Sequence, residues 1–168
     1  ELRKKGKIGE SDEEAEKLLD RGLGECWLGN PRVAGAVREA MVHFDGIKYA
    51  LLAWCIMPNH VHMVVKLLEE ETLDSVMHSI KSFSAKRANR ILGRKGSFWQ
   101  REYYDHVIRS EEELLETVKY VLWNPVKAGL EDWEWCGTEE KFVSSYERYV
   151  VGEETEEKPA GTPALQDA

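Results

Sequence analysis

Hydrophobic positions recur with a helical period in three stretches of the chain, each preceded by a residue that can cap a helix. The caps are Asn30, Thr72 and Ser110, and the apolar residues after each recur every three or four positions. This spacing predicts three amphipathic helices, the long one after Thr72 packing one face on a sheet. Asn124-Pro125 predicts the end of the third helix, because proline disfavours a helical conformation in the residue before it.

Two other stretches have the composition of strands. Tyr49 to Ile56 is apolar on both faces, which is typical of a strand buried on both sides. Residues 60–67 form a second expected strand, in which Val61 and Met63 point to a core on the face opposite His60 and His62, and Tyr103 to Ile108 is also strand-like. Ser11 begins a further short helix that Gly22 ends. Helices and strands together predict a mixed α/β (α+β) fold.

Length and composition predict one globular domain. The chain has 168 residues, 42% hydrophobic and 32% charged. We expect residues 1–150 to form the domain and residues 151–168, rich in Glu, Pro, Gly and Ala, to be a disordered tail. The three cysteines form no CxxC pair and no apolar run is long enough to span a bilayer. A reduced, cytoplasmic protein with no membrane partner is the simplest expectation.

Charge is distributed unevenly along the chain. The net charge of −8 by itself argues against nucleic acid, but Ser79 to Arg109 holds eight basic and two acidic residues, whereas Ser110 to Glu140 holds two basic and nine acidic. A local basic patch is sufficient to bind phosphates. The candidate cations are Lys81, Lys86, Arg87, Arg90, Arg94 and Arg101. An ordinary solvated helix face is the alternative.

Two histidines lie at the start of the second predicted strand. His60 and His62 flank Val61, and residues two apart on a strand point to the same face. Two neutral imidazoles on one face suit a divalent metal if a third ligand comes from elsewhere. The alternative is a strand with two chance histidines.

Tyr120 and Asn124 are four residues apart on the third predicted helix, which puts them on one face. The asparagine oxygen is an acceptable ligand for Mg²⁺ or Mn²⁺, and a phenol can act as a covalent nucleophile. Ordinary packing of a half-buried tyrosine is the alternative.

Three blocks of sequence resemble one protein family. They are residues 54–62 (WCIMPNHVH), 98–109 (FWQREYYDHVIR) and 120–130 (YVLWNPVKAGL). The first resembles the HUH motif of the single-tyrosine transposases. All three, in this order, resemble the REP-associated tyrosine transposases, a mostly bacterial branch of that superfamily. The likeness covers roughly residues 30–135.

The resemblance implies a fold and a reaction. The fold would be a ferredoxin-like antiparallel sheet with helices packed on it and the histidine pair on a central strand. The reaction would cleave and rejoin single-stranded DNA through a covalent 5′-phosphotyrosine. By position in the motifs, His60 and His62 match the metal ligands, Asn124 the residue that completes the Mg²⁺ or Mn²⁺ site, and Tyr120 the nucleophile.

The resemblance also implies a substrate, a hairpin of repetitive extragenic palindromic (REP) DNA with a single-stranded flank. The basic residues from 81 to 101 would hold the DNA backbone, and Trp99, Tyr103 or Tyr104 could stack on bases. His106 lies in the matching Tyr-Asp-His block. It is either a residue of the site or one that makes a structural hydrogen bond. A monomer and a homodimer are both compatible with the family.

One departure from the family leaves other functions open. Members usually begin with a strand that pairs beside the histidine strand, and no residue before Ser11 has that pattern. A catalytically decayed or domesticated hairpin-DNA-binding protein is therefore one alternative. A metal hydrolase that uses water is another.

Overall fold

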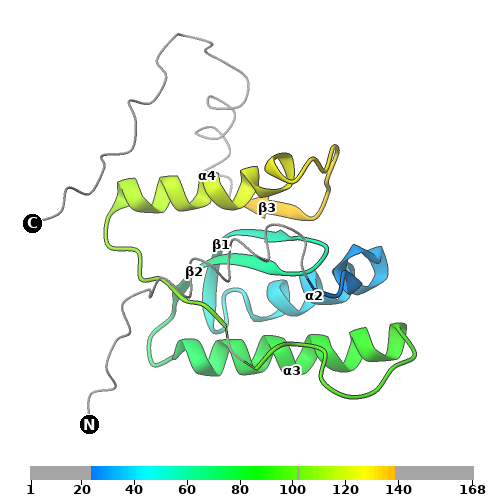
Figure 1. Cartoon of the computed structure of the whole chain (residues 1–168). Coiled ribbons are helices and arrows are strands. Elements are labelled where there is room, and N and C mark those ends of the chain that lie inside the picture. Colours follow the sequence, from blue (N-terminus) through cyan, green and yellow to red (C-terminus); the bar gives the residue numbers. More distant parts are fainter. Residues whose placement is uncertain (1–23, 102, 139–168) are drawn as a thin grey trace, which may run out of the picture.

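The structure is a computed structural model that describes residues 24–101 and 103–138. A sheet lies between helices, with α4 on one face and α2 and α3 on the other (Figure 1). The elements in order are η1 (Trp27–Gly29), α2 (Pro31–Phe44), β1 (Tyr49–Ile56), β2 (Val61–Leu67), α3 (Leu73–Ile91), α4 (Glu111–Lys127) and β3 (Cys136–Thr138). The expected helix after Ser11, the N-terminal strand and the tail from residue 151 lie outside the described residues. The mixed α+β class is confirmed.

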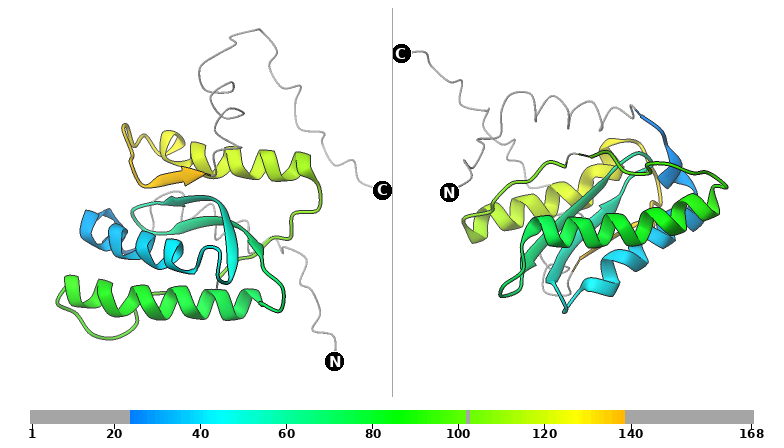
Figure 2. Two further views of the ribbon diagram at one scale, coloured as in Figure 1. Left: turned by 180° about the vertical axis from the view of Figure 1, so that it is seen from behind. Right: turned by 90° about the horizontal axis from the view of Figure 1, so that it is seen from below.

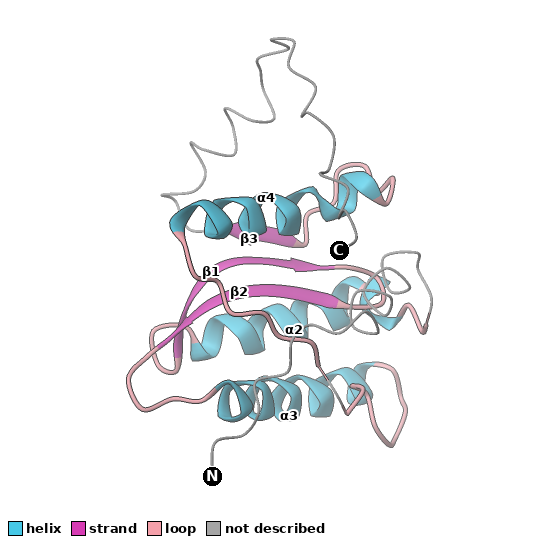
Figure 3. Ribbon diagram, turned by 60° about the vertical axis from the view of Figure 1, so that its left-hand side comes forward, coloured by secondary structure: helices cyan, strands magenta, loops and turns pink. Residues whose placement is uncertain are grey.

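The sheet is antiparallel, and its three described strands have the order β2-β1-β3. The histidine strand was expected in a central position with an N-terminal strand beside it; among the described strands β1 is central and β2 is outermost, and the expected N-terminal neighbour lies outside the described residues. This order is visible in the side chains. Seven of the eight β1 residues are buried, whereas β2 ends in the exposed Lys66 and Leu67. Figure 3 shows the strands between the helices.

A bulge in β1 sets which side chains face α4. Leu51 pairs with Val65 and Ala53 pairs with Val64, so Leu52 is an extra residue in β1. Leu52 and Ala53 consequently both pack toward α4. The shift continues to the strand end and places Cys55 opposite His62.

The core consists of two clusters, one on each face of the sheet. The first joins α2 and α3 to the sheet, and Val61, Met63 and Val65 of β2 pack against it. The second joins α4 to the opposite face and includes Val64. The predicted alternation of β2 is confirmed, because the apolar Val61 and Met63 face α2 and α3. Figure 2 shows the two helix layers from behind and from below.

All three predicted N-caps are present. The side-chain oxygens of Asn30, Thr72 and Ser110 accept hydrogen bonds from backbone N–H groups two or three residues later, at 3.0, 3.2 and 3.1 Å. Each cap supplies a partner to a helix-end amide that has none inside the helix.

The predicted end of α4 at Asn124-Pro125 is wrong, because the helix continues to Lys127 with Pro125 inside it. Pro125 lies in the last turn, so its missing N–H removes a single helical bond. The Asn124 carbonyl still accepts from Ala128 N at 3.1 Å, and the Pro125 carbonyl accepts from Leu130 N at 2.9 Å. These bonds and the burial of both residues keep the last turn helical.

The strand expected from Tyr103 to Ile108 is also wrong, because this segment pairs with no strand among the described residues. The segment passes from α3 to α4, and residues 104–107 are exposed. Tyr103 Oη donates to Asp74 of α3 at 2.5 Å. Burial and the Asp74 carboxylate raise the pKa of Tyr103 to about 12. Side-chain bonds to helices thus hold the segment in place of a strand ladder.

Part of the segment after α4 packs back on the domain through its tryptophans. Trp133 Nε1 donates to the Ile56 carbonyl at 2.9 Å, and Trp135 packs against the first cluster. Trp54 covers Gly137 of β3 so closely that an added Cβ there would be 2.6 Å from its Nε1. Over the two described ranges, we find no helix with the length and apolarity needed to cross a membrane.

Candidate functional site

Four side chains singled out in the sequence meet between β2 and α4. His60 Nε2 and His62 Nε2 are 2.9 Å apart, and the Asn124 amide nitrogen is 3.1 Å from His62 Nε2. The Tyr120 ring lies edge-on to the His62 ring, with 5.7 Å between centroids. The histidines and the helix residues are some 60 positions apart in sequence, so the fold brings them together.

Local structure fixes the position of each group. A tight turn, closed by a bond of 2.8 Å from Met57 N to the His60 carbonyl, leads from β1 into β2 and orients His60. On α4, Val121 and Leu122 pack into the second cluster and hold the helix on the sheet. Asn124 is 2% exposed and His60 8% exposed, so these two side chains are shielded from bulk water, whereas His62 is partly exposed.

Asn59 is a site residue that the sequence analysis did not identify. Its side-chain oxygen is 2.8 Å from His60 Nδ1. If Nδ1 carries the proton and donates to this oxygen, Nε2 keeps the lone pair with which an imidazole binds a metal. The signal in the sequence was the polar residue directly before the histidine motif.

The three groups fit a divalent ion. Two nitrogen ligands at about 2.1 Å in neighbouring octahedral positions are about 3.0 Å apart, which is close to the observed separations of 2.9 and 3.1 Å. A half-turn of the Asn124 amide puts its oxygen, an acceptable ligand, where its nitrogen now lies. Among the described residues, no three His, Cys, Asp or Glu side chains are grouped so that they could hold a metal ion, and Asn124 is a neighbouring side chain that could add an oxygen ligand to the two histidines.

Lys127 is a second residue that the sequence analysis missed as part of the site. Its Nζ lies 4.4 Å from the centroid of the Tyr120 ring. Tyr120, Asn124 and Lys127 occupy positions i, i+4 and i+7, which form one stripe along α4. The helical spacing was the available signal. One face of α4 thus presents a phenol, an amide and an ammonium group together.

His106 lies at the other end of α4. Its Nε2 is 2.6 Å from Glu113 Oε1, and the Arg109 backbone amide donates to Glu113 Oε2 at 2.6 Å. The Arg109 amide, followed by His106, lowers the pKa of the Glu113 carboxyl. Seven residues of helix, about 10 Å, separate Glu113 from Tyr120. Of the two expectations for His106, this contact matches the structural hydrogen bond.

The predicted DNA-binding cations lie on α3 and just after it, across the sheet from the tyrosine. Several are already engaged within the protein. Lys81 Nζ donates to the carbonyls of Gln100 and Arg101 at 2.9 and 3.3 Å, and Arg94 lies 3.8 Å from the centre of the Trp27 ring. Arg101, Lys86, Arg87 and Arg90 are exposed.

Trp99 is half-buried and packs against the first cluster. Its Nε1 donates to Ser84 Oγ at 2.9 Å. Tyr104, by contrast, is 51% exposed. Of the three aromatic residues expected to stack on bases, Tyr104 therefore presents the most accessible ring.

Comparison with known proteins adds independent findings. Residues 32–123 match the family model described as "Transposase IS200 like". A Haemophilus influenzae protein named provisionally as a REP-associated tyrosine transposase is 27% identical over 145 residues, covering 78% of this chain and 76% of that protein. The REP-associated tyrosine transposase of Escherichia coli is 30% identical over 90 residues, covering 51% of this chain and 52% of that protein.

A solved structure has the same fold. It is that of a REP-associated tyrosine transposase bound to a REP hairpin, with a TM-score of 0.61 and 21% identity. The match covers 87% of this chain and 88% of the other. The similarity extends over nearly all of both chains, so the arrangement of helices and sheet is shared.

Proposed function

Since the chain belongs to the IS200-like transposase family, we propose that it cleaves and rejoins single-stranded DNA with Tyr120 as the nucleophile. The observation that carries this proposal is the meeting of Tyr120 and Asn124 with His60 and His62. A nucleophile beside a ready-made set of metal ligands is the arrangement that phosphoryl transfer needs.

The reaction is a transesterification at phosphorus. Tyr120 Oη attacks the scissile phosphate and forms an O–P bond, while the bond from phosphorus to the 3′ oxygen breaks. The phenolic proton passes to solvent, and the departing 3′ oxygen takes up a proton. The 5′ phosphate stays on the tyrosine as an ester, so the attack of a 3′-hydroxyl reverses the step and joins strands without another energy source.

The neighbouring residues prepare the site for that attack. His60, His62 and Asn124 would hold Mg²⁺ or Mn²⁺, which when bound acts as a Lewis acid on the phosphate. Asn59 orients the His60 ring. The His62 ring and the Lys127 ammonium both lie beside the Tyr120 ring, with 5.7 Å between the ring centroids and 4.4 Å from Lys127 Nζ to the Tyr120 centroid.

The proposed substrate is a REP-type hairpin with a single-stranded flank. Two relatives are named as REP-associated transposases, and the structural neighbour was solved with a REP hairpin. This supports the same class of DNA for this chain. Action in the cytoplasm, as a monomer or as a homodimer, stays a prediction.

The test is a denaturing gel of the protein with a labelled hairpin oligonucleotide and Mn²⁺. We expect a heat-stable protein–DNA band from the wild type that is absent from Tyr120→Phe. Tyr104→Phe is the matched control, because it removes an exposed phenol but keeps the aromatic ring that could stack on bases, and it should retain the band. Circular dichroism establishes that each variant is folded.

Other outcomes identify the alternatives. Cleavage that survives Tyr120→Phe would favour a hydrolase that uses water. Hairpin binding by the folded wild type without cleavage in Mn²⁺ would favour a decayed binding protein. Either result would reject the tyrosine mechanism.

A further inference from the structure

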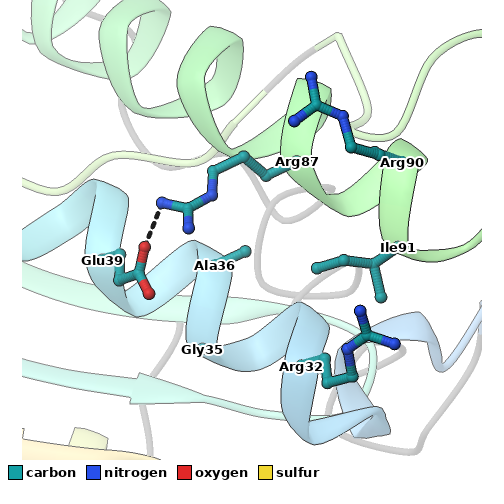
Figure 4. A pocket seen from close by; sticks show the side chains of 7 residues that line it. All are labelled: Arg32, Gly35, Ala36, Glu39, Arg87, Arg90 and Ile91. Carbon is teal, nitrogen blue, oxygen red and sulfur yellow. Dashed lines mark ion pairs between the residues drawn. The ribbon is translucent and has the colours of Figure 1, made fainter.

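Two cysteine side chains lie on the α4 face of the sheet, and the proposed reaction uses neither of them. Cys55 of β1 is buried in the second cluster, and Cys136 of β3 is partly exposed and packs against it. The cleft between α2 and α3, on the other side of the sheet, offers no such chemistry. Arginines line it and Arg87 forms an ion pair there with Glu39 (Figure 4), but none of its lining residues carries a thiol.

The register of β1 and β3 places the two cysteines directly opposite each other. Cys55 pairs with Cys136, and in the next pair the Ile56 amide donates to the Trp135 carbonyl at 2.8 Å. Hydrogen-bonded and non-hydrogen-bonded pairs alternate along an antiparallel ladder, so the cysteines form a non-hydrogen-bonded pair. The Cα atoms of such a pair are about 4.5 Å apart. This separation lies within the range of about 4.4–6.8 Å that a disulfide spans.

Contacts around the pair hold the two strands in this register. Thr138 Oγ1 donates to the Leu52 carbonyl at 2.9 Å, and Trp133 Nε1 donates to a β1 carbonyl at the same distance. A hydrogen bond joins the thiols of Cys55 and Cys136, and this bond together with burial raises the pKa of the Cys55 thiol. The two sulfur atoms are therefore neighbours in the reduced protein, and a bond between them requires no change of register.

The third cysteine lies elsewhere in the fold. Cys26 is exposed and directly precedes η1, whose Leu28 packs in the first cluster, on the opposite face of the sheet from Cys55. Cys26 therefore serves as an internal control for thiol chemistry that depends on exposure alone.

We propose that Cys55 and Cys136 are a site of reversible oxidation by hydroperoxides, at which a disulfide ties β3 to β1. With hydrogen peroxide, the partly exposed Cys136 sulfur attacks one oxygen, the O–O bond breaks, and a sulfenic acid and one water form. The Cys55 sulfur then attacks the Cys136 sulfur, the S–S bond forms, and the S–O bond breaks to release a second water. Two thiols and one peroxide thus give one disulfide and two waters. A small thiol reverses the step by attack at the more accessible sulfur.

The disulfide closes a covalent loop around the helix that carries the proposed nucleophile. Residues 56–135 lie between the cysteines and include α3 and α4, and therefore Tyr120 and Asn124. A cross-link that closes a loop restricts the unfolded chain and so stabilises the fold. Strand β3 has three residues, and the disulfide adds a covalent bond to its few backbone contacts. The oxidised protein consequently keeps α4 on the sheet at temperatures at which the reduced protein unfolds.

The experiment counts thiols in the full chain before and after oxidation. The reduced protein is treated with a graded series of hydrogen peroxide concentrations, denatured and alkylated with N-ethylmaleimide. Mass spectrometry of the intact chain counts the alkylated thiols, and peptide mapping identifies the bonded pair. We expect a monomer in which two of the three thiols are lost together as one Cys55–Cys136 disulfide, and dithiothreitol should restore both.

Matched variants separate this pair from general oxidation. Cys26→Ser should form the disulfide as the wild type does, whereas Cys136→Ser, with its fold established by circular dichroism, should keep Cys55 reduced. The disulfide should raise the melting temperature by about 5–15 °C in the wild type and in Cys26→Ser. Peroxide should give Cys136→Ser no such rise.

Three results would overturn the proposal. One is full alkylation of Cys55 and Cys136 at peroxide concentrations that oxidise Cys26. Another is conversion of Cys136 to a sulfinic acid while Cys55 stays reduced. A disulfide that forms without a rise in melting temperature would reject the stabilising role of the loop. The assay contains no DNA and no metal, so its outcome is independent of the tyrosine mechanism.

Discussion

Replacing Asn124 with alanine tests the proposed metal site. The amide is 2% exposed and 3.1 Å from His62 Nε2, so Asn124→Ala removes a buried hydrogen bond and leaves a small cavity. This should lower the free energy of unfolding of the metal-free protein by about 1–2 kcal/mol. The protein should still fold, because the packing of Val121 and Leu122 is unchanged.

The effect on metal binding should be larger. Loss of a residue that only supports a ligand costs about 10- to 100-fold in affinity, and loss of a ligand itself should cost at least as much. This corresponds to about 1.4–2.8 kcal/mol of binding free energy. Isothermal titration calorimetry with Mn²⁺ measures the affinity directly. The rise in melting temperature on adding Mn²⁺ should shrink in parallel, since it reports the same binding.

Matched variants make the result decisive. Asn89→Ala removes an asparagine on α3, where its amide bonds the Gly96 carbonyl, and should leave Mn²⁺ affinity unchanged. Asn124→Asp supplies a carboxylate oxygen at the same position and should restore binding. If folded Asn124→Ala binds Mn²⁺ as tightly as the wild type, Asn124 is not a ligand.

Three further substitutions have defined outcomes. Gly137→Ala puts a Cβ 2.6 Å from Trp54 Nε1 and should lower the free energy of unfolding by about 1–3 kcal/mol, measured by urea denaturation. The fold lowers the pKa of the Glu113 carboxyl, so the ionised carboxylate stabilises the protein fully above pH 4.5, the ordinary pKa of this group. This stabilisation is lost as the pH falls through the lowered pKa. Glu113→Gln should therefore have a lower melting temperature than the wild type at neutral pH, and the difference should disappear in acid. Lys127→Gln should slow single-turnover adduct formation about tenfold, because a cation beside the proposed nucleophile stabilises charge on the reacting phosphate. Lys127→Arg keeps the charge and should retain most of the rate. Equal rates in the wild type and both variants would show that Lys127 is not part of the site.

The sequence predicted those features that depend on local spacing. Helix caps, the alternation of β2 and the pairing of Tyr120 with Asn124 on one face all follow from short-range geometry, and each is present. The meeting of β2 with α4 did not follow from spacing. Motif resemblance implied it, and the structure shows it through the 3.1 Å contact of Asn124 with His62.

The errors share a physical cause. Pro125 remained helical because bonds and burial around it outweigh its local preference. Tyr103 to Ile108 has strand-like composition, but its contacts are with helices. Tertiary contacts, which are invisible to a local pattern, decided each case.

The place of β3 in the sequence has a consequence for folding during synthesis, because β3 is translated long after the strand with which it pairs. Thr138 Oγ1 bonds the Leu52 carbonyl across 86 positions, whereas β1 and β2 form a hairpin with a short turn. On the ribosome the hairpin with both histidines emerges well before α4 and β3. At that stage the nascent chain exposes both imidazoles but lacks Tyr120, the proposed nucleophile. The strand that pairs with β1 arrives only after Tyr120, so the proposed nucleophile and the third described strand are translated almost together.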